Sequence, residues 1–88
     1  MIIKVRGILL RFANYEHEIE VGGVTVREGL NAMVDRYPAM GDVLKDRDGT
    51  IRPTHFIALN GEGLTSGELD REACADDRVD VVTAISGG

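Results

Sequence analysis

Residues 25–38, TVREGLNAMVDRYP, carry the strongest helical pattern in the chain, and the rest of the fold is read outward from them. Thr25 and Glu28 have the spacing of a capping box, in which each side chain accepts a hydrogen bond from the other residue's backbone amide. Pro38 ends the segment, because proline disfavours helical geometry in the residue before it. Gly29 costs this helix about 1 kcal/mol relative to alanine. Helical spacing predicts one buried apolar stripe: Val26, Leu30, Met33, Val34 and Tyr37.

Two strands are predicted before this helix, because apolar and polar residues alternate there. The first covers residues 2–10 and includes the apolar run at 8–10. A loop is expected over residues 11–15. The second strand covers residues 17–21, is expected to run antiparallel to the first, and is closed by two glycines.

Shorter elements are predicted after the helix. A second helix is expected over residues 39–45, and residues 46–49 have the composition of a turn. Residues 55–59 form a clear strand, followed by Asn60-Gly61, a strong turn signal. The apolar residues expected to be buried in the second helix are Met40, Val43 and Leu44.

The last third of the chain is less regular. Residues 64–69 have room for a short strand, and residues 68–75 for one helical turn. Residues 78–84 alternate again and are predicted to form the last strand. Residues 85–88 are expected to form a free, extended tail.

This order of elements predicts an α+β fold of the β-grasp (ubiquitin-like) type. Its mixed sheet should have four to five strands, with one main helix packed across it. In this plan the last strand lies beside the first, parallel and central. We therefore expect a β-grasp domain over residues 1–84 and a C-terminal diglycine tail over residues 85–88.

Length, charge and cysteine content limit the function. The 88 residues suffice for one domain, and the net charge of −5 argues against nucleic acid as a partner while permitting a basic protein. No apolar run approaches the ~18–20 residues of a membrane span, so no membrane partner is expected. Residues 1–5 lack the basic start of a signal peptide, and Cys74 has no partner for an internal disulfide. A cytoplasmic location is the simplest expectation.

The final residues, Gly87-Gly88, have a direct chemical meaning. Glycine has no Cβ, so two in a row can enter a narrow slot and leave the terminal carboxylate unhindered. Residues 84–88, if extended, reach roughly 17 Å into a partner. Such a tail suits an enzyme that activates a main-chain carboxylate.

With this ending, the chain resembles the ubiquitin-like sulfur carriers of the MoaD, ThiS and CysO group, and MoaD and CysO most. Residues 25–30 and Tyr37-Pro38 resemble the family's helix, which opens at T-V-x-x-x-L and ends in Y-P. Residues 56–62 resemble its internal strand and N-G-E turn, and residues 77–82 the D-x-V segment of its last strand. Related proteins include the archaeal ubiquitin-like small modifiers.

Two positions depart from the family's pattern. The family often has G-D before the last strand, where this chain has Asp76-Asp77. It often has a proline where this chain has Thr83, so the root of the tail is less stiff. These departures bear on which activating enzyme the chain fits.

The resemblance implies that Gly88 carries the chemistry, with Gly87 beside it. An E1-like adenylyltransferase of the MoeB or ThiF type would use ATP to adenylate the Gly88 carboxylate, and a sulfur donor would displace AMP to give a thiocarboxylate. A sulfur-accepting synthase or sulfur-delivery enzyme would take the sulfur. The chain would then be a carrier and not an enzyme, with no catalytic residue, bound cofactor or metal of its own.

Four apolar residues are predicted to contact these partners: Val82, Ile85, Phe56 and Leu64. Strand side chains alternate between faces, so Val82 and Phe56 point outward if their neighbours face the core. Leu64 is expected to join them, and Ile85 begins the tail. The alternative is that these side chains are singly exposed, which is normal for surfaces.

Other reactive side chains are interpreted as structural. Cys74 is expected to be a half-buried small hydrophobe, because Asp76 and Asp77 would oppose its thiolate. His17 and His55 are not expected to bind metal or catalyse. An acidic group is read as a solvated face, or alternatively as a surface that steers a basic partner: Glu68, Asp70, Glu72, Asp76 and Asp77.

Three functions remain open at this point. The first is a sulfur carrier for molybdopterin, thiamin, cysteine, thiolated tRNA or another metabolite. The second is a ubiquitin-like modifier joined through Gly88 to substrate lysines, and a chain whose lysines are only Lys4 and Lys45 would rarely label itself. The third is a β-grasp interaction domain whose diglycine is incidental.

Overall fold

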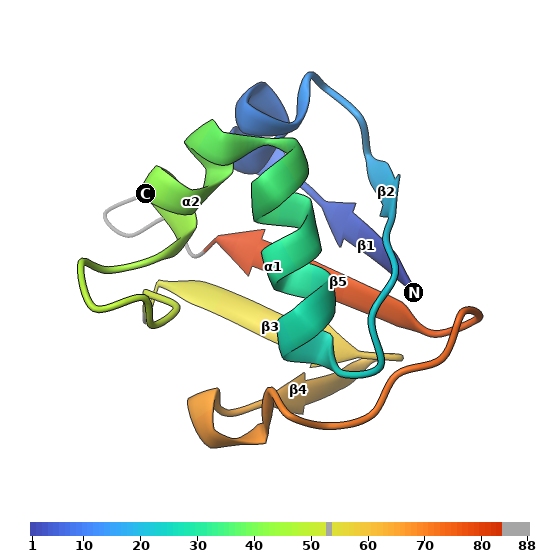
Figure 1. Ribbon diagram of the computed structural model, residues 1–88. Coiled ribbons are helices and arrows are strands. Elements are labelled where there is room, and N and C mark those ends of the chain that lie inside the picture. The colour runs from blue at the N-terminus through green and yellow to red at the C-terminus, as the bar shows by residue number, and fades with distance from the viewer. Residues whose placement is uncertain (53, 84–88) are drawn as a thin grey trace.

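The computed structural model describes residues 1–52 and 54–83, which form a five-stranded sheet in the order β2-β1-β5-β3-β4 (Figure 1). The strands are β1 (Ile2–Val5), β2 (Glu18–Glu20), β3 (His55–Leu59), β4 (Glu62–Leu64) and β5 (Arg78–Thr83). The helices are α1 (Val26–Arg36) and α2 (Pro38–Leu44), with two 3-10 segments, η1 (Gly7–Ala13) and η2 (Ser66–Glu68). This arrangement confirms the predicted β-grasp fold.

The last strand lies in the middle of the sheet, as predicted. β5 runs parallel to β1, with Ile3 opposite Val79 and Val5 opposite Val81, and antiparallel to β3. β1 and β2 pair antiparallel, as do β3 and β4. Because β1 and β5 run in the same direction, their C-terminal ends lie next to each other at the same end of the sheet.

Helix α1 begins where the sequence predicts, with one difference in its cap. Thr25 Oγ1 accepts a hydrogen bond from the Glu28 amide at 3.1 Å. Glu28 Oε1 accepts from the Val24 amide at 2.8 Å, one residue before the partner that a standard capping box would use. The first two backbone amides of the helix, those of Val26 and Arg27, donate to backbone carbonyls within residues 69–71. The start of α1 is thereby fixed to the segment that leads into β5.

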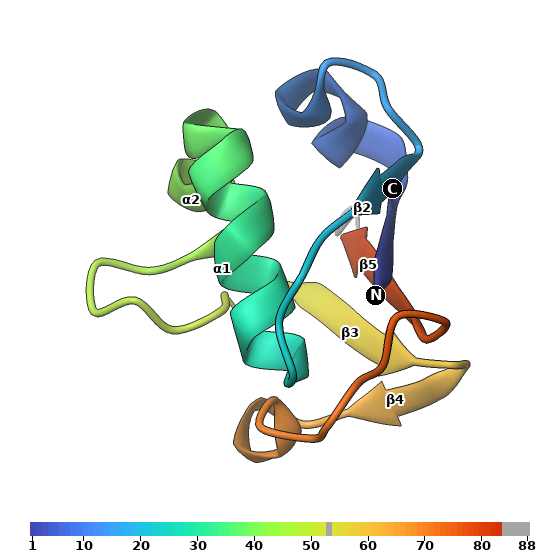
Figure 2. The ribbon, with the colours of Figure 1, turned by 45° about the vertical axis from the view of Figure 1, so that its right-hand side comes forward.

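Both α-helices lie on one side of the sheet, and the core lies between them and the strands (Figure 2). Of the predicted stripe, three residues are buried and two, Val34 and Tyr37, are partly buried. In α2, Met40 and Leu44 are buried and Val43 is partly buried. No helix within the described residues combines the length and hydropathy needed to traverse a bilayer.

The strand predicted over residues 2–10 is wrong in its second half. Gly7, with a φ of 63°, turns the chain out of β1 and into η1. In this helix Leu9 and Ala13 are buried, while Ile8 is exposed. The error has a physical reason: a short apolar run fits a buried strand and a helix equally well, so its period does not decide between them.

Other boundaries differ by a few residues. Residues 11–13, predicted as loop, complete η1. Helix α2 begins at Pro38, because proline suits the first position of a helix. β4 directly follows the Asn60-Gly61 turn, earlier than predicted. The helical turn expected within residues 68–75 does not form there. The 3-10 turn η2 instead ends at Glu68, and Thr65 forms a capping box across it.

Candidate functional site

The chain leaves the sheet at Thr83, the last residue of the central strand β5. The predicted carrier residues Gly87 and Gly88 and the predicted contact Ile85 lie outside the described residues, as does Ala84, the predicted end of β5. The part of the site that the structure describes is therefore the surface around Thr83. It includes the helix-free face of the sheet, η1 and the end of α2.

An apolar pair marks the helix-free face next to this exit. Phe56 on β3 lies directly opposite Val82 on β5. Their side chains are 61% and 40% exposed, whereas the neighbouring Ile57 and Val81 are buried. The predicted outward orientation of Phe56 and Val82 is therefore confirmed. Opposed residues on antiparallel strands have their Cβ atoms within about 5.5 Å, so the two side chains form one patch.

Leu64 does not belong to this patch, and its predicted placement is wrong. It pairs with Ile57 on β3, so it shares the inner face of the sheet with that residue. It is partly buried and packs against the core. The sequence around Leu64 contains too few alternating residues to fix its face, and the pairing register decides it.

Ile8 is an exposed apolar residue that the sequence analysis missed. It is 48% exposed and lies on η1, which packs against β5 and α2 at the exit edge. Ile8 belongs to the apolar run at 8–10, but the prediction of a strand for that run gave no reason to expect an exposed residue there. A helical reading, with Leu9 and Ala13 four residues apart on the buried side, leaves Ile8 outside.

Charged residues surround the apolar pair on the same face. Arg6 lies 3.9 Å from Asp80 Oδ1, and Lys4 lies 3.9 Å from Glu18. Asp80 Oδ1 is shielded from solvent and accepts no hydrogen bond from the described residues. Among the ion pairs of the described residues, Arg6 is the basic side chain that lies nearest to this shielded oxygen, so Asp80 and Arg6 form part of the charged rim beside Val82.

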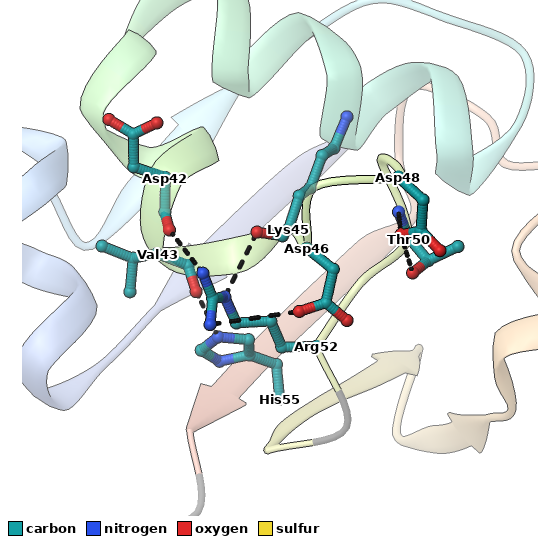
Figure 3. A network of polar contacts seen from close by, with 8 residues as sticks. All are labelled: Asp42, Val43, Lys45, Asp46, Asp48, Thr50, Arg52 and His55. Carbon is teal, nitrogen blue, oxygen red and sulfur yellow. Dashed lines mark hydrogen bonds and ion pairs between the residues drawn. The ribbon is translucent and has the colours of Figure 1, made fainter.

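On the other side of the sheet, Arg52 and His55 close the end of α2 (Figure 3). Arg52 donates from Nη2 to the Asp42 carbonyl and from Nε to the Lys45 carbonyl, both at 3.2 Å, and from its amide to the Leu44 carbonyl. His55 Nε2 contacts the Val43 carbonyl at 2.9 Å. The last carbonyls of a helix lack partners within it, so these contacts replace a cap. They hold α2 against the strand that carries Phe56.

The model of the ThiS family matches residues 3–88, nearly the whole chain. The chain belongs to the ThiS family. No curated protein matches it.

Solved structures share the fold of this ThiS-family chain. Small archaeal modifier protein 1 of Haloferax volcanii is 26% identical, with a TM-score of 0.84 over 100% of this chain and 98% of that one. A chain of the BexX/CysO complex of Amycolatopsis orientalis is 22% identical, with a TM-score of 0.85 over 99% and 98%. CysO of Mycobacterium tuberculosis is 20% identical, with a TM-score of 0.82 over 96% and 98%. This chain and the three solved structures thus share the ubiquitin-like fold of sulfur carriers and modifiers.

Two of the segments that were expected to resemble sulfur-carrier motifs, residues 56–62 and 77–82, meet at the far end of the sheet. Asn60 donates to Asp77 Oδ1 at 2.9 Å and accepts from the Arg78 amide at 2.9 Å. Asp77 Oδ2 accepts from the Cys74 amide at 2.7 Å. The backbone bond from Cys74, then the bond from Asn60, lowers the pKa of Asp77. These bonds fix the start of β5 and hence its register. They lie at the opposite end of the strand from Thr83, where the tail begins.

Cys74 lies with Asp76 and Asp77 just before β5, at the end of the sheet away from Thr83, whereas Glu68 belongs to η2, beyond β4. Cys74 is exposed, so the half-buried position predicted for it is wrong; it sits in the loop closed by Asp77. Part of the acidic group is paired, because Arg71 lies 3.9 Å from Glu68 and Arg27 donates to Asp70 at 2.8 Å. The group is a solvated surface with internal ion pairs.

The histidines are far apart in the sheet. His17 precedes β2 and His55 begins β3, with β1 and β5 between those strands. Over residues 1–52 and 54–83, no three His, Cys, Asp or Glu side chains gather closely enough to hold a metal ion. The main features of the site in this ThiS-family chain are the end of β5 at Thr83 and the apolar pair of Phe56 and Val82 beside it.

Proposed function

We propose that this ThiS-family protein is a sulfur carrier that works through the carboxylate of Gly88. The carboxylate attacks the α-phosphate of ATP on a separate E1-like enzyme and releases pyrophosphate. A sulfur nucleophile then attacks the acyl-adenylate, AMP leaves, and a thiocarboxylate remains. Such chemistry requires ATP and so fits the cytoplasm. The observation that supports it is a central strand that leads toward the diglycine beside an exposed apolar pair.

The docking surface of the proposal is the helix-free face around the exit. Phe56 and Val82 supply the apolar area of this face, and the exposed Ile8 on η1 lies at the same end of the sheet. Small apolar clusters with a charged rim are typical of protein interfaces. Ile85 would contact the enzyme as the tail enters its active site.

The acceptor of the sulfur is a second enzyme. The similar structure from Amycolatopsis orientalis is a complex of CysO with BexX. By analogy, we propose that the thiocarboxylate of this protein is consumed by a biosynthetic synthase that binds the same face. Activating and accepting enzymes would then bind in turn, because one tail cannot occupy two active sites.

Intact-mass spectrometry tests the carrier function. The full chain is incubated with the E1-like enzyme of the same organism, ATP and sulfide. We expect a mass gain that corresponds to replacement of one oxygen by sulfur, located on Gly88 by fragmentation. A chain without Gly88 should keep its melting temperature and gain nothing. An unchanged mass of the intact chain, with every E1-like enzyme of that organism, would contradict the proposal.

A protein modifier is the second candidate, favoured by the similarity to small archaeal modifier protein 1. Here the adenylated Gly88 is captured by a substrate lysine. The chain's own lysines are engaged, because Lys4 lies near Glu18 and Lys45 donates to Asn31 at 2.6 Å. A Gly-Gly remnant on lysines of other proteins in cell extracts, dependent on this chain, would support the modifier. The two functions can coexist.

A further inference from the structure

His55 is the buried polar side chain of the described core, and neither the chemistry nor the docking surface uses it. Its ring lies between the sheet and α2. Nδ1 is 2.9 Å from Thr83 Oγ1, and Nε2 is 2.9 Å from the Val43 carbonyl. A carbonyl only accepts, so Nε2 carries a proton, and Nδ1 of the neutral ring accepts from the Thr83 hydroxyl. Both polar ends of the ring are thus satisfied.

The contact lies where the tail begins. His55 and Thr83 are directly opposed in the β3–β5 ladder, at the end from which the chain departs. Threonine leaves φ free, whereas proline would lock it. A restraint on Thr83 can instead come from its side chain, because a β-branched residue has few χ1 rotamers and a bond at Oγ1 selects one of them.

The other end of the ring is fixed to a rigid support. The Val43 carbonyl belongs to the last turn of α2, which Arg52 holds through the carbonyls of Asp42 and Lys45 (Figure 3). The ring therefore connects the root of the tail to a helix end that cannot shift freely. A hydrophobic residue could fill the same space but could not make this connection.

We propose that His55 is a positioning residue for the C-terminal tail. Through Thr83 it sets the direction in which the chain leaves β5, and so aligns Gly88 with the adenylating site once the protein has docked. This role rests on the proposed function. It predicts that loss of the connection reduces turnover and leaves docking intact.

Two substitutions break the connection in different ways. Thr83→Val keeps the shape and removes the hydroxyl, and His55→Gln keeps a donor for the Val43 carbonyl but does not reach Thr83. With the E1-like enzyme and ATP, we expect kcat for adenylation to fall about three- to tenfold in both, with KM unchanged. Thr83→Ser, which keeps the hydroxyl, should restore kcat. A structural role alone would not separate kcat from KM.

A second measurement is independent of the enzyme. ¹⁵N relaxation of the amides of residues 84–86 in the free protein should show less order in Thr83→Val than in Thr83→Ser. If the wild-type chain is never adenylated, the proposed function fails and relaxation alone decides the positioning role. Equal relaxation in the two variants, with wild-type kcat wherever activity exists, would overturn the inference.

Discussion

Gly29 shows how one residue can be unfavourable for its element and favourable for the fold. Within α1 a glycine weakens the helix, but a Cβ at this position would overlap Met1 Sδ. Met1 is buried, and its ammonium donates to the Val21 carbonyl at 3.0 Å. The glycine thus leaves room for the first side chain of the chain, which fills the core under α1.

Replacing Gly29 by alanine is expected to destabilise the protein by about 1–3 kcal/mol, because overpacking outweighs the gain in helix propensity. Urea unfolding at neutral pH measures the change. Asp35→Ala, on the exposed side of the same helix, is the control and should be neutral or slightly stabilising. A more stable Gly29→Ala variant would show that the Met1 side chain relocates without cost.

At the scale of elements, the turn after β3 and the start of β5 are held together by Asn60 and Asp77. Asn60 has a positive φ of 51°, and Gly61 follows with 88°, so the tight hairpin turn presents the Asn60 side chain to β5. The carboxylate of Asp77 then accepts from two amide groups. Sequence motifs separated by more than ten residues thus form one local structure.

The lowered pKa of Asp77 makes this structure sensitive to acid. Its pKa in the folded state lies below the unfolded value, so the stabilisation is present above the usual carboxyl range and is lost as pH falls through the folded pKa. We expect Asp77→Asn to flatten the loss of stability below about pH 4. Asp76→Asn, which removes a neighbouring exposed carboxylate, is the control. Identical acid profiles for wild type and Asp77→Asn would contradict this.

Elements with a clear period, and the strand order that they imply, could be predicted from the sequence, whereas the type of a three-residue apolar run and the face of a three-residue strand could not. The 3.6-residue stripe predicted α1, the run at 55–59 predicted β3, and alternation predicted where β5 begins. The run at 8–10 was misread because its period is ambiguous over three residues. Leu64 was placed on the wrong face because a three-residue strand takes its orientation from its partner, Ile57. The exposed pair Phe56 and Val82 was found because β3 and β5 are long enough for the two-residue period of a strand to assign each side chain to a face.

For the whole molecule, the important division is between the two faces of the sheet. Helices α1 and α2 cover one face (Figure 2). The other face presents Phe56 and Val82, close to the end of β5. Docking would therefore bring the whole face and the tail to a partner in one orientation. Loss of apolar area on this face should weaken docking without changing the fold, since these side chains pack outside the core.

Phe56→Thr retains a strand-forming residue and removes the ring. We expect kcat/KM for adenylation to fall at least about tenfold, mainly through KM, as for a central interface residue. Its melting temperature should change little. Glu20→Thr, on an edge strand of the same face, should behave as wild type. Unchanged KM in Phe56→Thr would exclude this face as the docking surface.

Both edge strands of the sheet are three residues long, and each carries glutamate: β2 is Glu18–Glu20 and β4 is Glu62–Leu64. An exposed edge strand can pair with a strand of another molecule, and short edge strands with charged side chains make such pairing less favourable. A protein with an uncovered apolar face is otherwise at risk of fibril growth when it is abundant. Short edge strands that carry glutamate disfavour such pairing between copies of the chain, so the apolar pair can stay exposed for transient contacts with a partner.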